Sequence, residues 1–166
     1  MKRELPLVSF APLDADAVAF LAEETGVDFR SVDFDRPDWF CCTARNGHGA
    51  VVGVLACEFK AWFDADFSIA IADPACLNYR LIHAVFVALF STAKRITARV
   101  DPANRRAIQQ AMKLGFEVEG YAKLGLDGTR DAYLLGMTKD TCRWIRPRRR
   151  AFERRQTVRQ EHGKFT

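Results

Sequence analysis

The sequence lacks the features that mark several large classes of protein. No apolar run approaches the roughly 18–20 residues of a membrane span, and no apolar segment of a secretory signal follows Met1 to Glu4. We therefore expect a cytoplasmic protein with no membrane partner. The five cysteines are odd in number, and they share no metal-ligand spacing with the three histidines. A zinc site and a disulfide framework are thus not predicted.

An excess of positive charge is also missing from most of the chain. The 166 residues have a net charge of +4, yet residues 146–166 alone carry eight Lys and Arg against two Glu. The remaining body is mildly acidic. With 49% hydrophobic residues, the chain is rich enough in apolar side chains to fold alone. We predict one domain over 1–145 and a basic extension over 146–166, suited to a polyanion or an acidic protein, with a solvated tail as the alternative.

The first half of the chain reads as strand, helix and hairpin. A strand over 5–10 precedes a helix that ends at Thr25, capped by Asp14 or Asp16 and stopped by Gly26. Residues 27–40 are ambiguous. The remaining elements are strands over 40–45 and 50–59 joined at Asn46-Gly47, a loop over 62–66, and a buried strand over 67–72.

The second half alternates helices with strands. Apolar spacing predicts a helix over 81–93, and a strand follows over 95–100. Asp101 as N-cap and Pro102 at the first helical position then predict a helix that ends at Leu114, with Gly115 just after it. The last elements are strands over 116–123 and 130–138 and a helical stretch from Lys139 to Pro147. Helices inserted among hairpins predict an α+β fold with a helical layer on each face.

Residues 95–137 carry the most informative pattern. A strand leads to Asn104 near a helix start, the helix ends in Leu114-Gly115-Phe116, and Glu119-Gly120 opens the next strand. This pattern resembles the C-terminal half of the GCN5-related N-acetyltransferases (GNAT), in particular the ribosomal-protein alanine acetyltransferase type and small GNAT-like proteins of tailed phages. The resemblance implies a GNAT-like α+β fold, with a mixed, splayed sheet of six to seven strands and helices on both faces.

The resemblance also implies a reaction and a cofactor. A GNAT enzyme transfers an acetyl group from acetyl-CoA to a primary amine, here of a small molecule, a protein N-terminus or a lysine. Coenzyme A would lie between strands 67–72 and 95–100, with strand amides polarising the thioester carbonyl and a helix N-terminus holding the pyrophosphate. The residues implied for cofactor binding are Ile69, Ala70, Ile71, Ala72, Asn78, Tyr79, Arg80 and Asn104.

Two departures from the GNAT pattern stand against this function. Residues 74–83 contain no glycine, although the family binds pyrophosphate on a glycine-rich loop. Ala111 stands four residues before Gly115, where many GNAT enzymes carry the tyrosine that protonates the leaving thiolate. The alternative prediction is therefore a catalytically silent GNAT-fold module that binds or assembles through its arginine-rich tail, for example in a phage particle or a host-takeover complex.

Amine acetylation needs a base, and two residues are candidates for it. Glu58 is an acid late in an otherwise apolar strand, and His83 lies early in the helix over 81–93. Their alternatives are a solvated carboxylate at a strand end and an ordinary surface histidine. Cys76 has no partner that would make it a nucleophile, so we predict an inert thiol.

Overall fold

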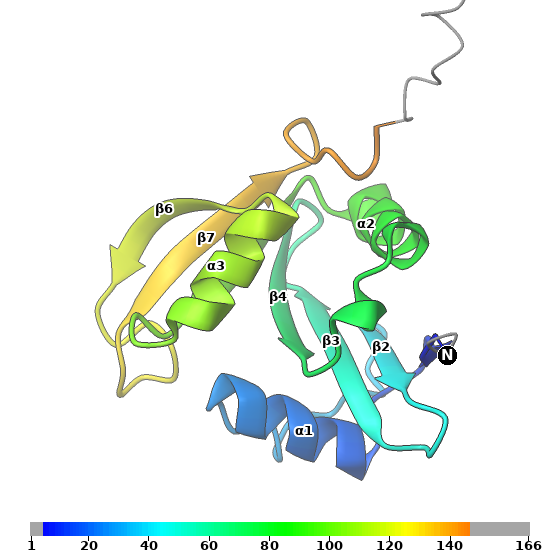
Figure 1. Cartoon of the computed structure of the whole chain (residues 1–166). Helices are drawn as coiled ribbons and strands as arrows, with labels where there is room; N and C mark the ends of the chain where they lie inside the picture. Colours follow the sequence, from blue (N-terminus) through cyan, green and yellow to red (C-terminus); the bar gives the residue numbers. More distant parts are fainter. Residues whose placement is uncertain (1–4, 147–166) are drawn as a thin grey trace, which may run out of the picture.

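The structure is a computed structural model that describes residues 5–146. It confirms the predicted order of strands and helices (Figure 1). The elements are β1 (Leu7–Ser9), α1 (Ala15–Thr25), β2 (Trp39–Arg45), β3 (Val51–Phe59), β4 (Asp64–Ile71), a 3-10 turn η1 (Pro74–Cys76), α2 (Tyr79–Thr92), β5 (Arg95–Val100), α3 (Arg105–Leu114), β6 (Glu117–Ala122) and β7 (Ala132–Thr138).

These seven strands form one mixed sheet in the order β1-β2-β3-β4-β5-β7-β6. Neighbouring strands are antiparallel except β4 and β5, which run parallel. That parallel pairing covers only Asp64 to Asp66 of β4, opposite Arg95 to Thr97 of β5. From Phe67 onward the two strands have no pairing with each other, so the sheet splays at its centre.

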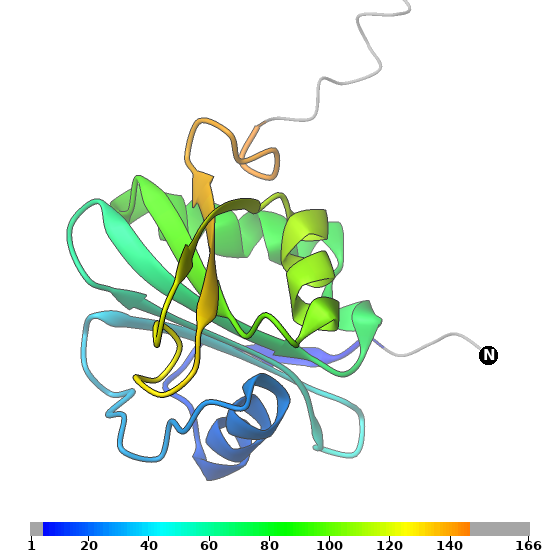
Figure 2. The same cartoon turned by 90° about the vertical axis from the view of Figure 1, so that its left-hand side faces the viewer.

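Helices cover both faces of the sheet, as predicted (Figure 2). On one face, Ala17 and Leu21 of α1 pack against Val54, Ala56 and Ala70. On the other face, the apolar sides of α2 and α3 share one core with the central strands. Its members include Phe67, Phe86, Leu89, Ile96, Leu114, Phe116 and Leu135, all buried. Alternating strand residues thus serve two separate cores, which fixes the register of the strands.

Helix ends follow the capping rules, with one correction to the sequence prediction. Asp14 caps α1, whose stop is the left-handed Gly26, and Gly115 ends α3 at a φ of 108°. The predicted α3 cap at Asp101 is wrong. The cap is Asn104, whose side-chain oxygen accepts from the Ala107 amide at 3.0 Å. Asp101 instead accepts from the Ala103 amide and forms a turn before the helix.

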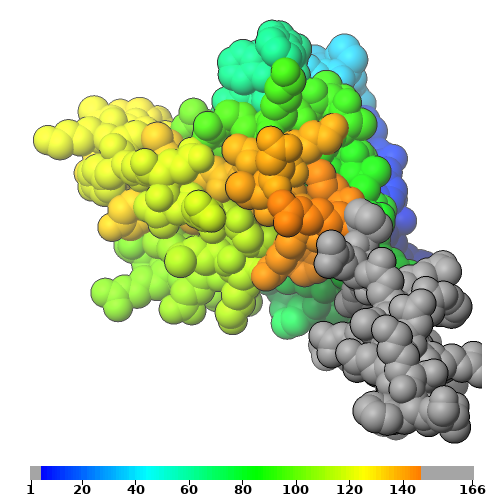
Figure 3. All heavy atoms as spheres, turned by 90° about the horizontal axis from the view of Figure 1, so that it is seen from above, coloured from blue at the N-terminus to red at the C-terminus, as the bar shows by residue number. Residues whose placement is uncertain are grey.

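Two other boundaries differ from the prediction. Strand β4 begins at Asp64, inside the predicted loop, because Asp64 to Asp66 pair with β5 and the last two of them also pair with β3. Residues 139–146 form turns instead of a helix. They cross the top of the molecule between α2 and α3 (Figure 3). There the Trp144 indole donates to the Leu114 carbonyl at 2.5 Å, so the segment serves as a lid on the core.

Two further predictions concern the ends of the chain and the membrane. The basic extension lies outside the described residues except for Arg146. No helix within residues 5–146 is both long and apolar enough to cross a bilayer.

Candidate functional site

The splay between β4 and β5 opens into a cleft. Its volume is about 210 Å³. One wall is the end of α1 with the segment after it, and the other is the first two turns of α3. The lining residues are Glu24, Thr25, Val27, Phe29, Trp39, Glu58, Asp66, Phe67, Ser68, Ile69, Thr97, Ala98, Arg99, Val100, Asp101, Asn104, Ala107, Gln110, Ala111 and Leu126.

The backbone of β4 offers hydrogen-bonding groups to this cleft. The Ala72 amide donates to the Val52 carbonyl at 3.0 Å, and the Lys60 amide donates to the Asp64 carbonyl at 3.1 Å. In an antiparallel pair such bonds recur at every second residue. The backbone groups of Ala70 and Ala72 are therefore turned toward β3, whereas those of Ile69 and Ile71 face the opening toward β5. Of the four residues 69–72 implied for the cofactor, Ile69 and Ile71 are therefore the two whose backbone groups point into the gap.

Two carboxylates face each other across the floor of the cleft. Glu58 and Asp66 are direct cross-strand partners on β3 and β4, and their side chains are only 16% and 25% exposed. Adjacent like charges repel, so each has a cation beside it. Arg99 contacts Asp66 at 2.7 Å, while Lys60 pairs with Glu58.

Asp66 is the site residue that the sequence reasoning missed. It is the last β4 residue that pairs with β5, so its carboxylate stands where the two strands part. The available signal was the alternation of polar and apolar residues in 64–68. That alternation places Asp64, Asp66 and Ser68 on one face of the strand.

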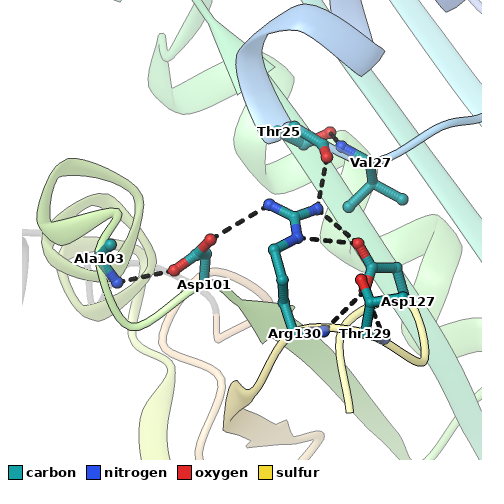
Figure 4. Close-up of polar contacts among 8 residues, drawn as sticks. Thr25, Val27, Asp101, Ala103, Asp127, Thr129 and Arg130 are labelled. Atoms are coloured by element: carbon teal, nitrogen blue, oxygen red, sulfur yellow. Dashed lines mark hydrogen bonds and ion pairs between the residues drawn. The ribbon is translucent and has the colours of Figure 1, made fainter. Parts of the chain in front are cut away.

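Arg130 joins three segments at the rim of the cleft (Figure 4). Its guanidinium donates to the Gly26 carbonyl at 2.6 Å, to Asp127 at 2.7 Å and to Asp101 at 3.2 Å. The bonds from Thr129 and Arg130 hold the pKa of Asp127 well below its usual range. The end of α1, the end of β5 and the β6–β7 loop thus form one rim.

Trp39 contributes an aromatic wall and an unusual polar group. Its ring meets Phe34 edge-on at 4.8 Å. The indole Nε1 and the neighbouring Asp38 Oδ1 are buried, and neither has a hydrogen-bond partner among residues 5–146. A buried N–H without an acceptor is costly, which makes Trp39 a candidate contact for a substrate.

Comparison with solved structures identifies the fold that carries this cleft. A ribosomal-protein-S5-alanine acetyltransferase from Vibrio fischeri aligns over 87% of this chain and 100% of its own, with 16% identity and a TM-score of 0.56. A GNAT family acetyltransferase from Elizabethkingia anophelis with acetyl-CoA bound aligns over 79% and 97%, with 14% identity and a TM-score of 0.60. This protein has the GNAT fold.

A third structure with the GNAT fold carries both a cofactor and an amine. It is a spermidine N-acetyltransferase from Vibrio cholerae in complex with CoA and spermine. It aligns over 84% of this chain and 98% of its own, with 13% identity and a TM-score of 0.56. At the level of sequence no protein-family model matches the chain, and a search of curated proteins finds no match.

The segment after β4 differs from the glycine-rich loop that the GNAT resemblance implies. The Ala75 amide donates to the Asp73 side chain at 2.9 Å, and the Cys76 and Leu77 amides donate to the Asp73 and Pro74 carbonyls, each at 3.0 Å. Asn78 caps α2 by accepting from the Leu81 amide at 3.0 Å. This cap engages the side-chain oxygen of Asn78 and leaves its side-chain amide as a donor. Arg80 is exposed in the first turn of α2.

The first turns of α3 contribute a polar and an apolar position to the cleft. Asn104 lines it while its oxygen caps the helix, which leaves the side-chain amide as a donor. Ala111, where many GNAT enzymes have tyrosine, also lines the cleft and is 7% exposed. Its methyl group offers no proton to a leaving group.

His83, Tyr79 and Cys76 lie away from the cleft lining. His83 Nδ1 is 2.5 Å from the Trp144 carbonyl oxygen, and its ring stacks on Tyr79 at 5.8 Å. Both rings help to hold the 139–146 segment. Cys76 is the last residue of η1 and is buried, and burial raises the pKa of its thiol. Its environment therefore disfavours the nucleophilic thiolate.

Proposed function

We propose that this protein is an acetyl-CoA-dependent N-acetyltransferase that acetylates a primary amine. One observation carries the proposal, namely the opening between β4 and β5. There, strand backbone groups face a cleft with a carboxylate pair on its floor. The GNAT fold of the acetyltransferases described above supports this assignment.

The cleft suits the pantetheine arm of acetyl-CoA. The amides and carbonyls of Ile69 and Ile71 face the gap and offer the alternating donors and acceptors that an amide-containing chain needs. The Asn104 side-chain amide adds a donor on the opposite wall. Acetyl-CoA, when bound, supplies a thioester whose carbonyl carbon an amine attacks. The strand N–H groups would then stabilise negative charge on the carbonyl oxygen.

The acidic floor of the cleft suits the amine. An ammonium ion must lose a proton before its nitrogen can attack, and a carboxylate at the floor accepts that proton, directly or through water. We assign this role to Asp66, because it stands where the strands separate and has a single cation beside it. Glu58, the base expected from the sequence, lies one strand further from the gap and contributes negative charge that attracts the ammonium.

The leaving thiolate finds no acid at position 111. The methyl group of Ala111 stands where the GNAT pattern has a phenol, so water must supply this proton. Because departure of a thiolate is aided by an acid, we expect a slower reaction than a tyrosine at this position would give.

Binding of acetyl-CoA tests the function directly. A ligand that binds only the native state raises the melting temperature, so millimolar acetyl-CoA is expected to stabilise the purified protein in thermal unfolding, with heat of binding in calorimetry. Protein that shows neither stabilisation nor heat would refute the enzyme and favour the silent module. The engaged amides after β4 and the alanine at position 111 are the observations on which that alternative rests.

The acceptor and the location follow from the same proposal. The amine belongs to a small molecule or to a protein N-terminus or lysine, and the reaction takes place in the cytoplasm, where acetyl-CoA is available. The arginine-rich segment 146–166 would contact a polyanion or an acidic protein, as a phage-type assembly module would require. Deletion of 146–166 is the matching control, because cleft chemistry should survive it.

A further inference from the structure

The η1 turn after β4 has few free backbone amides to offer the diphosphate of a cofactor. The amides of Ala75, Cys76 and Leu77 already donate within the segment. The segment is also packed down on the sheet, since a Cβ added to Gly53 of β3 would meet Cys76 Sγ at 3.1 Å. Amides engaged in this way cannot form an anion cradle without unfolding η1.

Arg106 stands beside this segment with an uncommitted charge. It is an exposed residue in the first turn of α3, and its Nη2 donates across the splay to the Ile71 carbonyl at 3.4 Å. Within residues 5–146 this long bond is the only polar contact of its guanidinium, and no carboxylate there pairs with it. By contrast, Arg99 and Arg130 beside the same cleft are paired with Asp66 and Asp101.

The position of Arg106 connects it to both parts of the cofactor. Ile71 is the last residue of β4, immediately before the segment where the GNAT resemblance locates the pyrophosphate. Its carbonyl faces the opening where the pantetheine arm would pair. A guanidinium that leaves this carbonyl for a phosphate therefore frees one acceptor for the arm. A planar guanidinium also binds two phosphate oxygens at once, which a lysine does not.

We propose that Arg106 binds the diphosphate of acyl-CoA, in place of backbone amides of a glycine-rich loop. This inference rests on the proposed function. It assigns cofactor affinity to α3, whereas the GNAT resemblance assigns it to the start of the preceding helix. It also predicts that the Arg106 side chain accounts for the contribution of the diphosphate to the affinity for acyl-CoA.

Calorimetry with two ligands tests the assignment. Acetyl-CoA carries the diphosphate, whereas S-acetylpantetheine has the same thioester arm without it. Arg106→Ala is expected to weaken acetyl-CoA binding about tenfold or more, as loss of a charge-assisted bond does, and to leave S-acetylpantetheine binding unchanged. Arg105→Ala removes the same charge from the neighbouring exposed residue and is expected to change neither ligand more than about twofold. Thermal unfolding of each variant verifies the fold.

The outcomes separate the two proposals. If the wild-type protein binds acetyl-CoA and both arginine variants bind it equally well, Arg106 is not the diphosphate ligand and the proposed function stands. An equal loss of both ligands in Arg106→Ala also overturns the assignment, because it indicates a general effect on the cleft. If the wild-type protein binds no acetyl-CoA, the proposed function fails and this assignment fails with it. Arg106→Lys, which keeps the charge but loses the planar fork, is expected to recover only part of the affinity.

Discussion

The two halves of the candidate cofactor site, the β4–β5 opening and the 73–78 segment, have diverged to different degrees. The opening keeps what the GNAT fold offers, with strand groups of Ile69 and Ile71 facing the gap and Asp66 at its floor. The 73–78 segment has turned its amides inward and carries an acid, Asp73, as its first residue. Under the proposed function, chemistry at the thioester and affinity for the phosphates are therefore separable, and variants in one half should leave the other intact.

The largest effect is expected at the floor of the opening. Asp66→Asn keeps the size of the side chain but removes the proton acceptor, so kcat/KM for amine acetylation should fall by about a hundredfold or more, with little change in acetyl-CoA binding. Asp64→Asn is the matched control, because Asp64 lies on the same strand face but outside the cleft lining. Equal losses of activity in both variants would contradict the role of Asp66.

A gain of function is expected on the opposite wall. Ala111→Tyr places a phenol in the cleft and should raise kcat about tenfold, because the leaving thiolate then has an acid beside it. Ala111→Phe adds the same ring without the hydroxyl group and should give no gain. Equal rates for the two variants, measured by release of free thiol, would show that protonation of the thiolate does not limit turnover.

The smallest effect is expected in the 73–78 segment. Asp73→Asn removes a negative charge near the diphosphate while its side-chain oxygen can still accept from the Ala75 amide. Acetyl-CoA should bind about two- to fivefold more tightly, with the larger gain at low salt. Asp140→Asn makes the same charge change at the other end of the strands, after β7, and should have no effect in the same titration. A gain in both variants would reflect net charge alone.

The fold was predictable because its signals are local. Asp14, Gly26, Asn46-Gly47 and Gly115 mark the helix ends and the hairpin, and the structure has each of them in the predicted place. The two boundary errors came from contacts between distant residues, whereas the misplaced α3 cap was a local choice between Asp101 and Asn104. Asp64 belongs to a strand because β5 pairs with it, and Trp144 lies in a turn because Leu114 accepts its indole bond.

The site was less predictable than the fold, for two physical reasons. The sequence does not show which strand amides face a gap, because that depends on a register set by β3. It also does not show that Arg106 is unpaired while Arg99 and Arg130 are paired across the fold, since their partners Asp66 and Asp101 lie 29 or more residues away along the chain. By contrast, the difference between residues 74–83 and the glycine-rich GNAT loop was visible in the sequence, because the segment contains no glycine.

The contacts of Arg130 have a consequence for how the protein is made. This residue binds the Gly26 carbonyl across 104 positions of sequence, so the rim of the cleft cannot close until the β6–β7 hairpin has left the ribosome. During synthesis α1 and the first four strands exist before their partners at this rim. This rim of the cleft is therefore completed only after residue 130 has been synthesised, long after α1.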